Sequence, residues 1–400
     1  MFDQLFKSPI ALARHRTGPL LEERLAFLTH LANQGYSRRQ LRRNANDLLV
    51  IAQLLGPASR ARKAMTPDQV KHHTANRRRL YPLATRWLQF MGSLRLPPAP
   101  VSPCAKKIKA FAHHMEHEEE LSPTTIQTRC WFVTQFFDRL RVKGGSLHEI
   151  TPHRIDTAFQ KLVDPGGYSR NTIQTWVYAL RAFFRFAAAR GWCRKGLAAC
   201  IRGPRVFSQA SLPLGPSWDD VRRLLASTEG DRRHDIRARA ILLLLAVYGL
   251  RAGEVGRLRL EDFDWEHEVF SVVSSKTKRV RTYPLARSVG DAILRYLQEV
   301  RPRSSHRELF LSLRAPFRPV RKSLWSMVAE RLRSLHVSLS HYGPHVLRHA
   351  CATRLLAAGL SLKEIGDQLG HTDPNSTRIY AKVDLAGLRQ VADFDLGGVL

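Results

Sequence analysis

The chain has 400 residues, more than one hydrophobic core usually supports, and its 44% hydrophobic content is typical of a folded protein. It carries 64 lysines and arginines against 34 aspartates and glutamates, and the surplus of 30 positive charges favours DNA or RNA as a partner. No apolar run reaches the roughly 18 residues of a membrane span, and the five cysteines form no CxxC pair. These features argue against a membrane protein and a disulfide scaffold, and they predict a cytoplasmic protein associated with the nucleoid.

Residues 1–95 are predicted to form an extra helical domain that is basic. Leucines recur there at helical spacing, and arginines cluster beside them at 38–39, 42–43 and 77–79. A proline-rich stretch at 96–103 follows and marks a linker, because proline fixes the backbone and ends helices. The pattern of apolar residues in 1–95 resembles that in 104–203 with a one-residue offset. Either a diverged duplication or shared helix periodicity accounts for the similarity.

Residues 104–203 are predicted to form a second helical domain. Apolar side chains recur on one stripe from Ile126 to Leu140 and on another from Val177 to Ala187. Ser122 and Ser169 stand just before these stripes and are suited to cap the helices. A cluster of His113, His114 and His117 precedes three glutamates at 118–120. We interpret it as a solvated helix face rather than a zinc site, because no further ligand set accompanies it.

Residues 216–400 are predicted to form an α+β domain, mainly helical with a small antiparallel sheet. Helices are expected over 221–226 and 238–248. The pattern then changes to period two: 269–273 reads as a strand, 276–278 as a turn and 280–285 as the hairpin partner. Helices are expected from 289 to the end of the chain.

Several residues of this third segment are candidates for chemistry. Arg251 follows a Tyr-Gly-Leu sequence at the end of an apolar helix, with Glu254 three residues later; taken alone, the pair is also typical of a helix end with an ion pair. His345 and Arg348 follow Pro344, which suits a first helical turn, and their spacing of three places both on one face. Such a pair forms either an anion site at a helix start or a solvated basic face.

Two further candidates lie near the end of the chain. His371 stands between Leu369-Gly370 and Asp373-Pro374, so we expect it on a turn. Tyr380 follows nine residues later, where a tyrosine is most often a packing residue.

Together these motifs resemble those of the tyrosine recombinase, or phage integrase, family. The resemblance lies in the Gly-Leu-Arg-Ala-Gly-Glu sequence at 249–254, the His345-x-x-Arg348 pair, the Leu-Gly-His sequence ending at His371, and Tyr380. The order matches too, as do the intervals of 23 residues from Arg348 to His371 and nine to Tyr380. Lys276 falls where the family has its β-hairpin lysine, although Lys278 is an alternative. The resemblance covers residues 104–385 and does not extend to 1–95.

The resemblance implies a mechanism of DNA cleavage and rejoining. Tyr380 would attack a phosphodiester in line and form a 3′-phosphotyrosine, while Lys276 would protonate the departing 5′-oxygen. Arg251 and Arg348 would stabilise the extra negative charge on the nonbridging oxygens, with His371 adding a further donor.

Two residues would support this set. Glu254 would orient Arg251, and His345 would position the phosphate or take the tyrosine's proton. The covalent link conserves the bond energy, so no ATP is required, and cationic side chains replace the metal ions of other phosphoryl-transfer sites. We therefore expect no cofactor and no metal ion.

The family resemblance also implies an assembly. Residues 104–203, as a SAM-like core-binding domain, and 216–400, as the catalytic domain, would clamp double-stranded DNA, with four protomers in a synapse and accessory or sister recombinase proteins as further partners. Residues 1–95 would bind arm-type DNA sites or other proteins. Apolar residues from Leu385 to Phe394 predict a short C-terminal helix that is either donated to a neighbouring protomer or folded back.

Two other functions are compatible with these motifs. A type IB topoisomerase shares the same catalytic residue types but relaxes DNA as a monomer. A DNA-binding regulator would have lost catalysis, but no member of the catalytic set is missing here.

Overall fold

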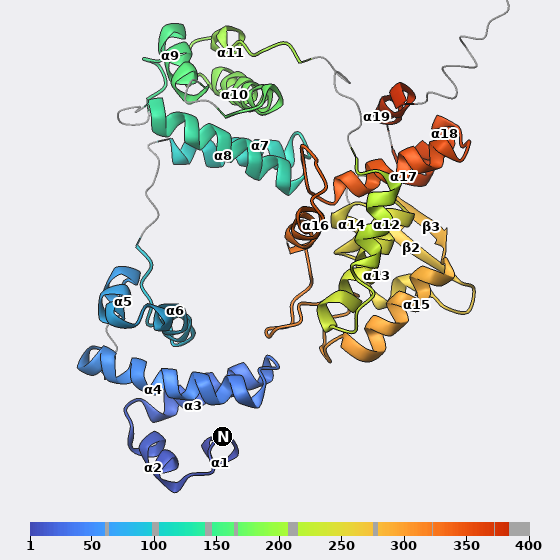
Figure 1. The fold of residues 1–400 in the computed structure, drawn as a ribbon. Helices are drawn as coiled ribbons and strands as arrows, with labels where there is room; N and C mark the ends of the chain where they lie inside the picture. Colours follow the sequence, from blue (N-terminus) through green and yellow to red (C-terminus); the bar gives the residue numbers. More distant parts are fainter. Residues whose placement is uncertain are drawn as a thin grey trace, which may run out of the picture. The chain divides into compact units, whose positions relative to one another are not determined.

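A computed structural model describes residues 1–60, 64–97, 104–140, 146–163, 167–206, 215–274, 279–321, 323–371 and 373–383. Within these residues the chain is mainly helical, with one three-stranded antiparallel sheet (Figure 1), which confirms the predicted fold class. The contacts divide the chain into two units, one made of Met1–Arg95 with Ser211–Leu400 and the other of Leu96–Ala210. None of the helices in the described ranges is long and apolar enough to cross a membrane.

The N-terminal segment forms its own hydrophobic core. Leu28, Leu48 and Trp87 are fully buried in it, and Thr66 and Gln69 cap one helix reciprocally, each side chain bonding the other's backbone. The elements of this segment are α1 (Phe2–Leu5), α2 (Pro9–Thr17), α3 (Leu21–Asn33), α4 (Arg38–Arg60), α5 (Pro67–His73), η1 (Ala75–Leu80) and α6 (Tyr81–Phe90).

The second unit packs around aromatic side chains. Phe111 and Phe137 each meet Phe183 edge to face, an arrangement that aromatic rings prefer. Ser122 and Ser169 accept the backbone N–H groups three residues on, so both predicted helix caps are confirmed. The helices are α7 (Ala105–His117), α8 (Pro123–Leu140), α9 (Pro152–Val163), α10 (Arg170–Ala189) and α11 (Leu197–Cys200).

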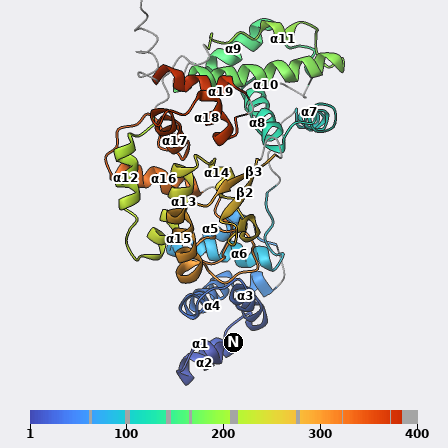
Figure 2. The same ribbon diagram turned by 90° about the vertical axis from the view of Figure 1, so that its right-hand side faces the viewer.

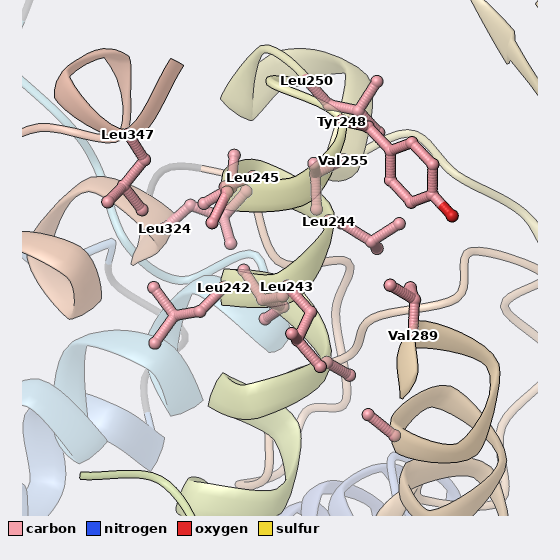
Figure 3. Packing of buried hydrophobic residues seen from close by; sticks show 14 of the residues in the cluster. Leu242, Leu243, Leu244, Leu245, Tyr248, Leu250, Val255, Val289, Leu324 and Leu347 are labelled. Carbon is pink, nitrogen blue, oxygen red and sulfur yellow. The ribbon is translucent and has the colours of Figure 1, made fainter. Parts of the chain in front are cut away.

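The C-terminal segment is built around one helix, α13 (Arg233–Val247), whose second half is apolar on every side. Figure 3 shows Leu242, Leu243, Leu244 and Leu245 of α13 pointing in different directions into the surrounding core. A helix of this kind must be covered all round, and α12 (Trp218–Ala226), α15 (Arg287–Arg295), η4 (Tyr296–Val300) and α17 (His345–Ala357) contact it.

The sheet contributes buried side chains to this core and is ordered β1-β2-β3; its strands β2 and β3 are labelled in Figure 2. Strands β2 (Val269–Val273) and β3 (Val280–Pro284) form the predicted hairpin, with Phe270 opposite Tyr283. The two-residue strand β1 (Phe263–Asp264) was not predicted, because it is too short to show an alternating pattern. The predicted turn at 276–278 and the predicted tail helix lie outside the described residues.

The last part of the chain forms a small core that carries the candidate tyrosine. Cys351, Ile365, Leu369 and Tyr380 are buried together there. The elements that complete the segment are α14 (Ala252–Val255), η3 (Leu260–Asp262), α16 (Ser323–Ser334), α18 (Leu362–Leu369), α19 (Asn375–Arg378) and η5 (Ile379–Val383).

Candidate active site

Arg251 is positioned by a sharp turn after α13. Gly249 adopts a left-handed conformation with φ +60°, and a Cβ atom there would lie 2.4 Å from Leu369 Cδ2. Only glycine fits this turn without strain or displacement of Leu369. The turn brings Arg251 to the start of α14, where its guanidinium lies 3.0 Å from Glu254 Oε1 and donates to Gly370 O at 3.3 Å.

Arg348 lies one turn into α17 and is 1% exposed. Its two terminal nitrogens donate to Gly249 O at 2.6 Å and to Leu369 O at 2.7 Å. Burial, followed by the charge of Arg251, lowers its pKa to about 10. The guanidinium therefore remains charged at neutral pH, and its plane is fixed by two carbonyls.

Arg281 is a third arginine of this site, and the sequence motifs did not single it out. Its Nη2 lies 2.9 Å from Glu254 Oε1, and its Nη1 donates to Gln368 O at 3.3 Å. A sequence signal did exist: Arg281 lies two residues before Tyr283 and so shares the inward face of β3. An arginine on a buried strand face needs an acidic partner.

The last turn of α18 is where the three arginines meet. Arg281, Arg348 and Arg251 donate to the carbonyls of Gln368, Leu369 and Gly370 respectively. The C-terminal carbonyls of a helix carry partial negative charge and attract cations. Glu254, 2% exposed, accepts from two of the three guanidinium groups and from the backbone N–H of Arg251. Motifs far apart in the sequence are thus brought together.

The predicted histidines lie within the electrostatic reach of these arginines. Burial, then Arg348 and Arg251, lowers the pKa of His371 to about 4, and partial burial with the same two charges lowers that of His345. Both imidazoles are therefore neutral at pH 7. His371 lies just after Gly370, on the predicted turn, and its Nδ1 is 2.7 Å from Thr377 Oγ1. His345 is the first residue of α17, and part of its surface stays open to solvent.

Tyr380 lies on η5 and is 2% exposed. Burial raises the pKa of its phenol to about 12. Its hydroxyl lies 3.0 Å from Nδ1 of His349, which burial, then His345 and Arg348, keeps neutral by lowering its pKa to about 4. His349 was not among the predicted site residues, although its position four residues after His345 places both on one helix face. Lys276 and Lys278 lie outside the described residues.

Two known domain families match parts of this chain. The phage integrase family matches residues 217–386, and the phage integrase N-terminal SAM-like domain matches residues 108–191. Neither match extends into residues 1–95.

Among related sequences, the putative integrase/recombinase y4rA of Sinorhizobium fredii is 36% identical over 290 residues, which are 71% of this chain and 69% of that protein. The tyrosine recombinase XerC of Alcanivorax borkumensis is 32% identical over 302 residues, which are 72% of this chain and 92% of that protein.

Two solved structures share the fold. A XerH site-specific recombinase bound to its difH substrate gives a TM-score of 0.57 at 18% identity, covering 73% of this chain and 87% of that chain. A lambda integrase dimer bound to a core site gives a TM-score of 0.55 at 17% identity, covering 74% of this chain and 99% of that chain. The two domain matches and the related sequences show that this chain belongs to the phage integrase family of tyrosine recombinases, enzymes that cleave and rejoin DNA.

Proposed function

We propose that the chain is a site-specific DNA recombinase, of the integrase or transposon recombinase type, which works through a 3′-phosphotyrosyl intermediate on Tyr380. The observation that carries this proposal is the convergence of three arginines on the last turn of α18, beside the buried core that holds Tyr380. Fixed positive charge of this kind suits a phosphodiester whose transition state is more negative than its ground state.

Arg251 and Arg348 are the proposed donors to the nonbridging oxygens of the phosphate. Arg251 donates to one backbone carbonyl and Arg348 donates to two. These hydrogen bonds fix the orientation of each guanidinium plane before DNA binds. A donor that is already oriented costs no reorganisation during the reaction. His371, tied to Thr377 through Nδ1, would present its other ring nitrogen to the same oxygens. Neutral histidine carries one N–H, so this role requires the proton on Nε2.

Lys276 is the proposed general acid for the departing 5′-oxygen. It belongs to the segment that joins β2 to β3 in the sequence, and Arg281 connects β3 to the site through Glu254 and Gln368. These contacts of Arg281 support the proposal that the hairpin places a lysine near the scissile phosphate. Glu254 would orient Arg251 through two hydrogen bonds, and His345, at the open start of α17, would contact the phosphate.

Double-stranded DNA is the proposed substrate, and recombination in a tetrameric synapse is the proposed reaction. The XerH and lambda integrase structures that share this fold are complexes with DNA. The surplus of 30 positive charges fits a partner whose binding releases many counterions. Accessory or sister recombinase proteins would complete the assembly.

We propose the domain assignment 104–203 for core binding and 216–400 for catalysis, with residues 1–95 binding additional DNA. In the N-terminal segment, Arg39, Arg42 and Arg43 of α4 line one surface depression together with Arg79 of η1. Asp47 is the acidic residue of this depression, 3.5 Å from Arg79, so positive charge is in excess there. Guanidinium groups in this arrangement suit backbone phosphates.

The N-terminal assignment is tested by binding of the full chain to long DNA. Arg42→Glu should weaken binding more than Arg14→Glu, which changes the net charge equally on α2 of the same segment. Equal losses would mean that only total charge matters and would contradict the assignment.

The catalytic proposal is tested with nicked suicide substrates made from candidate element ends. The wild type and Tyr342→Phe should form a covalent DNA adduct, and peptide mapping should place it at Tyr380. Tyr380→Phe should bind DNA but form no adduct, because only the hydroxyl is removed. A normal adduct yield in Tyr380→Phe would refute the assignment of the nucleophile.

A plasmid carrying two such ends separates recombination from relaxation. Recombinant circles are expected from the wild type. Relaxed plasmid without recombinants would instead indicate a topoisomerase activity.

A further inference from the structure

His349 lies beside the proposed nucleophile. It is on α17, one helical turn after His345, and its ring meets that of His345 edge to face at 4.6 Å. On the other side its Nδ1 lies 3.0 Å from the hydroxyl oxygen of Tyr380, within the normal range of a hydrogen bond. The two rings are 5.7 Å apart and inclined by 60°. The imidazole thus contacts the oxygen that must attack phosphorus.

The phenol of Tyr380 needs a proton acceptor in order to react. Burial raises its pKa to about 12, although the charge of Arg348 opposes the rise. At pH 7 only about one molecule in 10⁵ would carry the phenolate, since each pKa unit is a factor of ten. A hydroxyl in this state becomes an effective nucleophile when a neighbouring base takes its proton during attack.

The imidazole of His349 is available for that role. Burial and the neighbours His345 and Arg348 lower its pKa to about 4, so it is neutral at pH 7 and has one unprotonated ring nitrogen. With the proton on Nε2, the Nδ1 atom accepts the hydrogen bond from Tyr380. A bound phosphate would add negative charge near Arg348 and so favour protonation of the imidazole.

Resting on the proposed function, we propose that His349 is the general base for Tyr380, taking its proton through Nδ1 as the hydroxyl attacks. The bond between Tyr380 Oη and phosphorus forms while the O–H bond breaks and its proton passes to Nδ1. The bond from phosphorus to the 5′-oxygen breaks, and that oxygen takes a proton from the general acid. On rejoining, the 5′-hydroxyl attacks phosphorus and returns its proton to the deprotonated general acid, the phosphotyrosine bond breaks, and His349 returns its proton to Tyr380.

The first test compares single-turnover cleavage by the full-length wild type, His349→Asn and His349→Ala on the suicide substrate. Asparagine places an amide group near the position of Nδ1, so it retains a hydrogen-bonding partner but cannot take a proton. Both variants should cleave on the order of 100-fold more slowly, as loss of a general base predicts. His341→Asn, an exposed histidine of the same segment, should cleave at the wild-type rate.

Near-normal cleavage by His349→Asn would show that hydrogen bonding alone suffices and would overturn the proposal. DNA binding and thermal unfolding of each variant are measured in parallel.

A second test changes the acidity of the nucleophile. A fluorinated tyrosine at position 380 has a more acidic phenol, which depends less on a base. The loss caused by His349→Asn should then shrink by roughly tenfold, because general base catalysis follows the proton affinity of the reacting group. If His349→Asn lowers the cleavage rate equally with tyrosine and with fluorotyrosine at position 380, His349 has a structural role and the proposal is overturned. This comparison holds even if His349→Asn is less stable than the wild type.

A third test distinguishes proton removal from Tyr380 from proton donation to the leaving 5′-oxygen. On DNA whose leaving 5′-oxygen is replaced by sulfur, which departs without a proton, His349→Asn should remain slow. Recovery on this substrate would move the role of His349 to the leaving group and overturn the proposal. Absence of any Tyr380 adduct in the wild type would refute the proposed function and this inference together, whereas a normal adduct in His349→Asn refutes the inference alone.

Discussion

Replacement of Glu254 by glutamine should loosen the site and destabilise the C-terminal segment. The carboxylate is 2% exposed and accepts hydrogen bonds from Arg251 Nη1 at 3.0 Å, Arg281 Nη2 at 2.9 Å and the Arg251 backbone N–H at 2.9 Å. Glutamine keeps the shape but removes the negative charge that both guanidinium groups share. The amide N–H₂ of glutamine would also be placed against N–H donors of Arg251 or Arg281, where the carboxylate has an oxygen that accepts.

The size of the effect follows from the burial of the partners. Removing one member of a buried ion pair costs about 3 to 5 kcal/mol, because the remaining charge is left uncompensated. The Arg281 side chain is 16% exposed, but that of Arg251 is 36% exposed and is partly screened by water. We therefore expect the lower end, about 3 kcal/mol. For a segment of 150–250 residues this corresponds to a fall in melting temperature of about 6 to 12 °C.

Thermal unfolding of the full chain, combined with hydrogen exchange of peptides from α14 and β3, measures this change where it arises. Glu229→Gln is the matched control, because Glu229 also pairs with an arginine at 3.3 Å but is 65% exposed. Exposed pairs contribute little, so the control should melt as the wild type does. A loss below about 1 kcal/mol in Glu254→Gln, with unchanged exchange in β3, would refute the idea that this carboxylate holds the arginines together.

Other expected outcomes concern catalysis, pH and salt. Arg251→Lys and Arg348→Lys should each slow single-turnover cleavage by about 100- to 1000-fold, since an ammonium lacks the two parallel donors of a guanidinium; near-normal rates in both would make these arginines structural. His349 and His371 have pKa values of about 4 when folded against 6.5 for a free imidazole. The unfolded chain therefore binds more protons between pH 4 and 6.5, so the stability present above 6.5 should fall as the pH drops towards 4. Asparagine at both positions should weaken the pH dependence of the free energy of unfolding, measured by denaturant titrations. An unchanged pH dependence would contradict the role of these two histidines. DNA affinity should fall steeply as salt rises, and a flat plot of log Kd against log salt would contradict a charge-driven clamp.

Local features of this protein could be predicted from the sequence because they depend on residues close together in the chain. Ser122 and Ser169 begin helices because a serine oxygen can accept an N–H three residues on, whatever lies elsewhere. The β2–β3 hairpin followed from alternating side chains, and the turn at His371 from its neighbouring glycine and proline. The motif residues Arg251, Arg348 and His371 were singled out because their order and spacing resemble those of the tyrosine recombinase family.

The tertiary structure alone decided which atoms of these motifs meet. Arg348 donates to the carbonyl of Gly249, 99 residues away, because α17 packs against α13. Arg281 reaches the carbonyl of Gln368, 87 residues away, at the last turn of α18. His349 and His345 look alike in the sequence, but the packing of η5 on α17 brings Tyr380 to His349. Periodicity determines which face of a helix is buried. The partner of each polar group on that face depends on where distant elements end, and no local pattern encodes that position.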